Sequence, residues 1–316
     1  MGWNYYSAQR EAAIYDDSFY SEEIVEVQIV AGSSVAEIGA LLEASGVISS
    51  GDLFRYYNSA SGYGSQLQAG RYHFNIGMSI AAVTAKLVDG EVYRETFIFV
   101  IPEGSNIYQI AAAAERQGFG SAELFLEAAA DSSLRQASDE VIFALEGYLF
   151  PATYSFEELP SADELLEIFY DEALRRLDRL EIPEDHPLSL DEIVILASIL
   201  EKESQYDGER ERVAGVFLNR LEIGMPLQSC ATVQYLLSEF KEILSYEDTQ
   251  IESPYNTYIY AGLPPGPISS PGELALEAVL HPEETDYLYF VVGSDGQHIF
   301  SHTYEEHLAA AAWLGE

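Results

Sequence analysis

Positive charge is scarce in this chain of 316 residues. It has 15 Lys and Arg against 53 Asp and Glu, which gives a formal net charge of −38 at pH 7. A surface of this sign repels phosphate backbones, so the composition excludes a nucleic-acid partner. It also provides no polybasic patch for anionic lipid. The acidity has an ordinary alternative explanation, which is solubility or adaptation to salt.

Cysteine is limited to Cys230, which excludes an internal disulfide framework and a cysteine-based zinc site. The six histidines show no HExxH-type spacing, so we expect no metal and no other cofactor. Long apolar runs are also lacking. No stretch approaches the roughly 20 apolar residues of a membrane span, and residues 1–21 form a polar lead-in without the apolar core of a signal peptide.

Hydrophobic residues make up 48% of the chain and aromatic residues 12%, enough to bury one large core or two ordinary ones. An internal repeat follows the lead-in. The alternating segments 25–29 and 97–101 each predict a strand, followed by a turn and two helices. Gly32 and Gly46 of the first copy match Gly104 and Gly118 of the second. Between the copies, a further strand is expected near residues 67–74 and a short helix near residues 81–87.

The candidate catalytic carboxyl groups are predicted on one helix. This helix begins at a capping box formed by Ser189 and Glu192. Residues 193–200 are apolar nearly all round, so the helix should be buried centrally. Glu201 and Glu203 follow, about 200° apart around the helix, and cannot share a face. Glu203 stacks over apolar residues at the negative end of the helix dipole, which favours the protonated carboxyl that a general acid needs. A solvated helix end is the alternative.

The fold class expected from these patterns is α+β, with small βαα modules followed by a mixed helical and β domain built round the buried helix. Several segments together resemble the YceG-like family, the endolytic murein transglycosylases. The matching segments, in chain order, are Glu146–Pro151, Ala197–Ser204, Val213–Leu221, Ile223–Gln228, Tyr255–Tyr258, Gly262–Ile268 and Asp286–Val291. The resemblance covers residues 22–312 and implies cleavage of the bond between MurNAc and GlcNAc in peptidoglycan, with formation of 1,6-anhydro-MurNAc.

The same resemblance implies the site residues. Glu203 is the implied catalytic carboxylate, and Glu201 is the alternative. The residues implied to bind substrate are Ser204, Gln228, Tyr255, Asn256, Thr257, Tyr258, Glu146 and Tyr148. Among them, Gln228, Tyr255 and Asn256 are expected to position the sugar, and Tyr258 and the loop of Tyr148 to stack against it.

Two departures from the family's pattern bear on this hypothesis. Where the family usually has an Asp-Pro pair, this chain has Cys230 and Ala231, which would reduce activity if that Asp holds the site's geometry. The family's N-terminal membrane helix is also absent. We therefore expect the native protein to be anchored by a single span, with this part on the extracytoplasmic face of the bacterial cytoplasmic membrane.

The resemblance also suggests a domain plan. After the lead-in come a LysM-like module at residues 22–92, a second repeat with a helical connector at 93–187, and the catalytic domain at 188–316. Expected partners are peptidoglycan glycan strands and cell-wall synthases. Two other functions remain open at this point: a non-catalytic glycan-binding or scaffold protein, and a hydrolase that uses both Glu201 and Glu203. The second is disfavoured because the two carboxylates lie on opposing faces.

Overall fold

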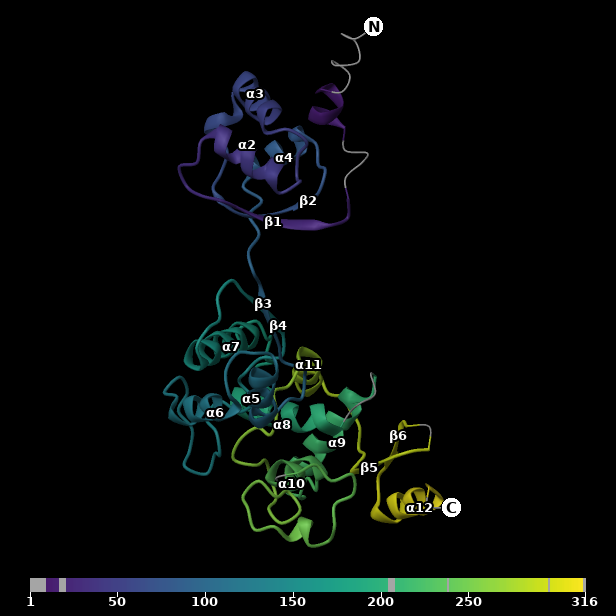
Figure 1. The fold of residues 1–316 in the computed structure, drawn as a ribbon. Helices are drawn as coiled ribbons and strands as arrows, with labels where there is room; N and C mark the ends of the chain where they lie inside the picture. The colour runs from purple at the N-terminus through teal and green to yellow at the C-terminus, as the bar shows by residue number, and fades with distance from the viewer. Residues whose placement is uncertain (1–9, 17–20, 204–207, 238, 295, 315–316) are drawn as a thin grey trace. The chain divides into compact units, whose positions relative to one another are not determined.

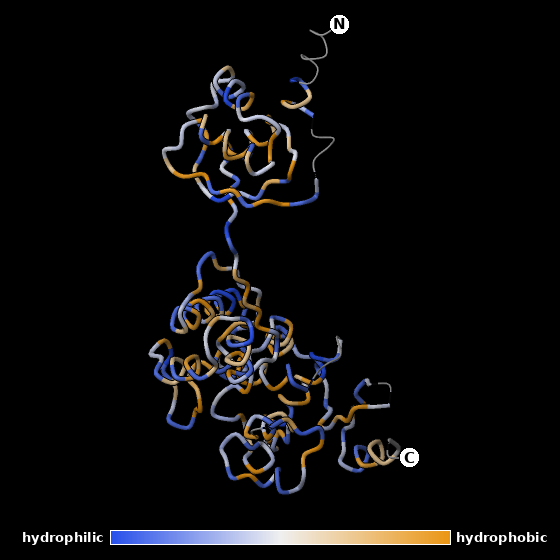
Figure 2. Tube along the Cα trace, viewed as in Figure 1, coloured by the Kyte–Doolittle hydropathy of each residue, from blue (hydrophilic) through white to orange (hydrophobic). Residues whose placement is uncertain are grey.

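The computed structural model describes residues 10–16, 21–203, 208–237, 239–294 and 296–314 (Figure 1). The chain divides into two compact units, residues 1–96 and 97–316. The hydrophilic residues 91–96, which form neither helix nor strand, join the two (Figure 2). Helices and small antiparallel sheets make both units, which confirms the α+β class. Within the described ranges, no helix combines the length and the apolar character that crossing a membrane requires.

In the described part of the first unit, residues 10–15 are helical, and two strands and three further α-helices follow from residue 24 on. Its elements are β1 (Ile24–Ile29), α2 (Val35–Ala44), α3 (Gly51–Ser61), a 3₁₀ turn η1 (Tyr63–Ser65), β2 (Gly70–Asn75) and α4 (Ile80–Asp89). Ser34 caps α2 through a capping box with Glu37. Helices α2 and α3 touch through Gly39 and Gly51, where a Cβ on Gly39 would lie 2.7 Å from the Gly51 carbonyl oxygen. Only glycine allows this approach.

The second unit opens with the same order of elements. These are β3 (Phe97–Val100), α5 (Ile107–Arg116), α6 (Ala122–Asp131), β4 (Thr153–Phe156) and α7 (Ala162–Leu177). Strand β3 pairs with β4 as β1 pairs with β2, both antiparallel. In each copy a tyrosine hydroxyl donates to the carbonyl oxygen four residues earlier: Tyr72 to Gln68 at 2.9 Å, and Tyr154 to Phe150 at 2.6 Å. The repeat is therefore a unit of five elements, βααβα.

The expected strand–helix–helix repeat was too short, because each copy has a further strand and a further helix. Strand β2 and helix α4, which we expected between the copies, belong to the first copy, and β4 and α7 are their counterparts in the second. The sequence spacing hides this because the second copy has a longer connection, residues 132–152, between its second helix and its second strand. That connection carries Glu146 and Tyr148.

The rest of the second unit is built on α8 (Leu190–Glu203), which begins at the predicted capping box: the backbone N–H of Ser189 donates to Glu192 at 2.8 Å. Residues 193–200 of α8 are all buried. Their core is shared with Tyr148 and Phe150 of the long connection and with Leu177 of α7. Residues 97–187 and 188–316 thus form one compact unit, in which part of the second repeat packs into the core of α8 and the rest forms a core cluster of its own.

Three further helices pack against α8, and a hairpin packs against the first of them. They are α9 (Arg210–Glu222), α10 (Cys230–Leu236), α11 (Glu273–Leu280), β5 (Tyr289–Val292) and β6 (His298–Ser301), followed by α12 (Tyr304–Leu314); a 3₁₀ turn η2 (Asp248–Gln250) lies between α10 and α11. Strands β5 and β6 form a hairpin, with Tyr289 opposite Ser301 in an antiparallel pair. Helices α9, α10 and α11 all contact α8, so the end of α8 is held from several sides.

Candidate active site

Glu203 is the last residue of α8 and is partly buried. Its Oε1 accepts a hydrogen bond from the hydroxyl of Ser229, the residue that caps α10. Burial raises the pKa of Cys230 and Tyr258, and the charge of Glu203 adds to both rises. At Arg220, burial lowers the pKa and the charge of Glu203 opposes that fall. The end of the buried helix thus carries a carboxylate into a small polar cluster. Ser204, implied as a substrate contact, lies outside the described residues.

Glu201 points to a different place. Its Oε2 accepts a hydrogen bond from the backbone N–H of Gly272, the residue before α11, at 2.9 Å. Its Oε1 lies 3.9 Å from the guanidinium of Arg210. Burial raises the pKa of the Glu201 carboxyl, and the hydrogen bond from Gly272 opposes that rise. Glu201 therefore ties α8 to α11, and the two carboxylates diverge as helical geometry predicts.

The backbone of residues 227–229 is pinned beside Glu203. The N–H of Gln228 donates to the carbonyl of Thr257 at 3.0 Å, and the N–H of Ser229 donates to Thr257 Oγ1 at 3.1 Å. Gln228 has a φ of 50°, in the left-handed region that non-glycine residues seldom adopt. Its side chain is exposed. Strain of this kind persists only where neighbouring contacts enforce it, and it is frequent at functional sites.

Arg220 is a residue beside the site that the sequence analysis did not single out. It is buried on α9, and its guanidinium donates to the carbonyls of Leu227 and Leu288, both at 2.6 Å. Burial lowers the pKa of this guanidinium, while neighbouring acidic groups, among them Glu203, oppose the effect. One signal was present: Arg220 follows Val213 and Phe217 on the buried face of the helix. An arginine on an apolar stripe marks a cation with a specific internal partner.

Residues 254–258 contact the residues of α10 that lie next to Glu203. Thr257 is buried, and its Oγ1 lies 2.9 Å from Thr232 Oγ1 in α10. Tyr258 is only partly buried, and its hydroxyl lies 3.0 Å from the Cys230 thiol. Burial raises the pKa of the Tyr258 hydroxyl above its ordinary value. The segment thus fixes the residues next to Glu203 from one side.

Tyr255 and Asn256 do not fit a direct role in sugar binding. They are 1% and 0% exposed. The hydroxyl of Tyr255 accepts from the backbone N–H of Ile142 at 3.4 Å. The Asn256 amide donates to the carbonyls of Thr249 and Ile251, at 3.0 and 2.8 Å. Both side chains form hydrogen bonds with backbone groups of neighbouring loops. They therefore hold the loops of the site in position and do not line its surface.

Comparison with known proteins gives the family. The model of the YceG-like family matches residues 27–312. The chain belongs to the YceG-like family. It is similar to an endolytic murein transglycosylase of Bacillus subtilis, with 35% identity over 91% of this chain and 84% of that protein. An endolytic murein transglycosylase of Streptococcus pneumoniae is 33% identical over 91% of this chain, which spans 58% of that longer protein.

A solved structure supports the fold of this YceG-like chain. The crystal structure of a YceG-like protein from Listeria monocytogenes matches with a TM-score of 0.61 and 32% identity. The match covers 92% of this chain and 99% of the Listeria chain. Both units of this YceG-like protein therefore have counterparts in an experimental structure.

In this YceG-like protein, Tyr148 and its neighbour Phe150 are buried and cannot form the expected stacking wall. The hydroxyl of Tyr148 donates to Asp191 in the first turn of α8, and Arg135 stacks over the ring at 4.1 Å from its centroid. The residue therefore anchors the start of α8. The expectation failed because an aromatic-rich loop looks the same in sequence whether its rings face solvent or the core.

Glu146 is also buried, at 1% exposure. Its Oε2 accepts from the first backbone N–H of α5, at Ile107, at 3.1 Å and from the hydroxyl of Tyr235 at 3.0 Å. Its Oε1 is buried without a partner among the described residues. Burial raises the pKa of this carboxyl to about 7, although the hydrogen bonds oppose the rise. The residue links α5 to α10 inside the protein, so it does not contact substrate directly.

A pH-dependent stability follows from Glu146. Because its pKa is raised from 4.5 to about 7, the folded state keeps a proton that the unfolded state releases between those values. This contribution to the free energy of unfolding is complete below pH 4.5 and is lost as pH rises to about 7. Its full size is about 3 kcal/mol. Glu146→Gln should remove it. Denaturant unfolding at pH 5 and pH 8 measures the change.

The difference in unfolding free energy between Glu146→Gln and wild type should shift in favour of the variant as pH rises from 5 to 8. Glu140→Gln, at an exposed position in the same connection, controls for the loss of one carboxylate. Parallel pH dependences for Glu146→Gln and wild type would contradict the assignment.

The cluster around Glu203 can perform proton transfer with a single carboxyl group. Ser229 orients the carboxyl, and the buried Arg220 holds the strained backbone beside it. Glu201, two residues away in sequence, is occupied elsewhere. Among the residues that the structure describes, no three His, Cys, Asp or Glu side chains gather closely enough to bind a metal ion.

Proposed function

We propose that this chain is a murein transglycosylase that cleaves glycan strands of peptidoglycan within the strand. The YceG-like family match and the relatives named endolytic murein transglycosylase support the reaction class. The observation that carries the proposal for the site is Glu203, a partly buried carboxyl at the end of α8 that Ser229 holds through a hydrogen bond. Glu203 is the catalytic residue in this proposal.

The reaction needs one group that first gives and then takes a proton. The Glu203 carboxyl protonates the glycosidic oxygen between MurNAc C1 and GlcNAc O4, and the C1–O4 bond breaks. The C6 hydroxyl of the same MurNAc attacks C1 and forms the C1–O6 bond of 1,6-anhydro-MurNAc. Its proton passes to the Glu203 carboxylate, which restores the acid. No water is consumed, and the intramolecular attack has a high effective molarity, so positioning supplies much of the acceleration.

The surrounding residues support this proton cycle. The Ser229 hydroxyl can donate to Glu203 in both protonation states because a carboxyl group keeps an acceptor oxygen in each. The exposed Gln228 side chain, on its strained backbone, offers an amide to a sugar hydroxyl. A two-carboxylate hydrolase fits less well, because Glu201 accepts its hydrogen bond from Gly272 at α11.

Several finer expectations belong to the proposal. We propose that the native protein acts on the extracytoplasmic face of the cytoplasmic membrane, held by an N-terminal span. We also propose that the first unit is a LysM-like module and that cell-wall synthases are partners. Their basis is the family resemblance.

The product ends test the proposal. Purified glycan strands are digested with the chain, and new ends are identified by mass spectrometry. The expected result is 1,6-anhydro-MurNAc ends that form within strands, without incorporation of ¹⁸O from labelled water. New reducing ends carrying ¹⁸O would instead indicate a hydrolase. Tight binding to strands with no new ends would indicate a non-catalytic glycan-binding protein.

A further inference from the structure

A cavity of about 650 Å³ lies in the second unit beside the proposed catalytic cluster. Its volume is within the range of roughly 300–1,000 Å³ typical of ligand sites. Helices α5 and α10 and the residues after α10 line it. Lys202 and Ala231 are lining residues, and they are the chain neighbours of Glu203 and Cys230. The cavity is therefore adjacent, along the chain, to residues of the catalytic cluster.

Two aromatic rings stand on different walls of this cavity. Phe240 is 82% exposed and Tyr108 is 45% exposed, although both are large apolar groups. The Tyr108 ring packs edge-on against Phe143 at 5.5 Å, which fixes its orientation. Exposed aromatic rings of defined orientation are the usual platforms for flat, partly apolar ligands.

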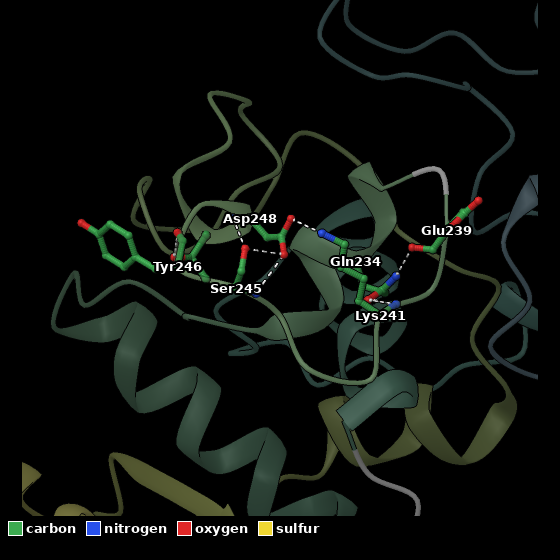
Figure 3. A network of polar contacts seen from close by, with 7 residues as sticks. Gln234, Glu239, Lys241, Ser245, Tyr246 and Asp248 are labelled. Carbon is green, nitrogen blue, oxygen red and sulfur yellow. Dashed lines mark hydrogen bonds and ion pairs between the residues drawn. The ribbon is translucent and has the colours of Figure 1, made fainter.

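The backbone on both sides of Phe240 is pinned by one side chain (Figure 3). The Gln234 amide donates to the carbonyl of Glu239 at 3.1 Å and accepts from the N–H of Lys241 at 3.2 Å. Lys241 in turn pairs with Asp248 at 2.6 Å. An exposed ring on a braced backbone loses little conformational freedom on binding, which is the advantage of preorganisation.

The polar groups of the cavity suit an uncharged ligand. The oxygens of Asn106 and Gln109 are used in the capping box of α5. Among the described residues their amide nitrogens donate no hydrogen bond, so these donors are available at the cavity wall. Lys202 and Glu239 also line the cavity, and the Lys202 ammonium already donates to the carbonyl of Gly104 at 3.1 Å. Sugar rings, with hydroxyls and an apolar face, match this lining better than the charged ends of a peptide.

We propose that this cavity is a subsite that holds sugar residues of the glycan strand away from the cleaved bond, with Phe240 and Tyr108 as stacking platforms. This inference rests on the proposed function and extends it to strand recognition. The second repeat copy supplies one wall through Asn106, Tyr108 and Gln109. The corresponding positions of the first copy are Ser34, Ala36 and Glu37, without an aromatic ring. The two copies have therefore diverged at the positions that line the cavity.

Binding to peptide-free glycan strands tests the subsite. The 316-residue chain carrying Glu203→Gln is titrated with strands in calorimetry, so that no cleavage interferes. Phe240→Ala and Tyr108→Ala, each added to that background, should weaken binding about five- to tenfold. Ile243→Ala is the matched control, because Ile243 is 85% exposed, follows Phe240 closely and does not line the cavity. It should bind like the parent.

Gln234→Leu provides a second variant that keeps both rings but releases the backbone beside Phe240. It should weaken binding by a similar factor while the circular dichroism spectrum is unchanged. In the active chain, Phe240→Ala should raise KM more than it lowers kcat, as expected for a group that binds remote parts of the substrate.

Equal affinities of Phe240→Ala, Tyr108→Ala and Ile243→Ala would overturn the subsite. So would a loss of affinity seen only with strands that carry stem peptides. Neither result affects the proposed function, which depends on the anhydro ends made by the wild-type chain. Absence of those ends would refute the reaction, and the calorimetric comparison would still report on the subsite.

Discussion

Glu203→Gln should reduce the rate of anhydro-end formation by about 10²–10⁴-fold, the usual contribution of a general acid–base. The amide has nearly the shape of the carboxyl and can still accept the hydrogen bond from Ser229 Oγ, so the fold should be kept. It cannot deliver a proton to the glycosidic oxygen or recover one from the C6 hydroxyl. Liquid chromatography with mass spectrometry of digested strands measures the rate.

Glu201→Gln is the matched control, two residues earlier on the same helix. Its remaining amide oxygen can accept the hydrogen bond from Gly272, so activity should stay within a few fold of wild type. Ser229→Ala should fall between the two, with a loss of about 10- to 100-fold, because a hydrogen bond to a charged group contributes about 1.5–3 kcal/mol. Full activity in Glu203→Gln, or an inactive but folded Glu201→Gln, would remove Glu203 from the catalytic role.

Arg220→Met should destabilise the second unit by about 3 kcal/mol or more. The substitution fills similar space but leaves the carbonyls of Leu227 and Leu288 without their donors, and each buried acceptor left unpaired costs about 1–3 kcal/mol. Because the chain has two compact units, unfolding by urea should be followed with a probe in residues 97–316, so that the affected transition is isolated.

Arg212→Met is the control in the same helix. Arg212 is more exposed and forms a surface pair with Glu283 at 2.9 Å. Surface pairs of this kind contribute up to about 1 kcal/mol, and salt weakens them. The Arg220 effect should be larger and insensitive to salt. Equal losses in the two variants would mean that the Arg220 guanidinium is not an essential internal donor.

Local signals in the sequence were sufficient to predict the helix that carries the site. The capping box at Ser189 and the apolar run after it predict the start and the burial of α8, and the spacing of Glu201 and Glu203 predicts their divergence. Each of these inferences depends on residues within a few turns of one another.

The orientation of loop side chains could not be predicted in this way. Tyr255 meets the backbone of Ile142, and Glu146 meets Tyr235. These contacts join segments that only the folded chain brings together. A motif indicates which residues assemble but not which of their atoms face solvent. The roles of Tyr255, Asn256 and Tyr148 therefore changed from contacting sugar to holding the site in place.

The long connection in the second repeat has a consequence for how such proteins can be rearranged by recombination. Through Glu146 it reaches Tyr235 of α10, and through Tyr148 it reaches Asp191 of α8. A break at residue 187 would separate each of these pairs and leave the buried Glu146 without its tyrosine donor. The second repeat copy is thus part of the same folding unit as the proposed catalytic site. A recombined gene would have to keep residues 97–316 together to preserve these contacts.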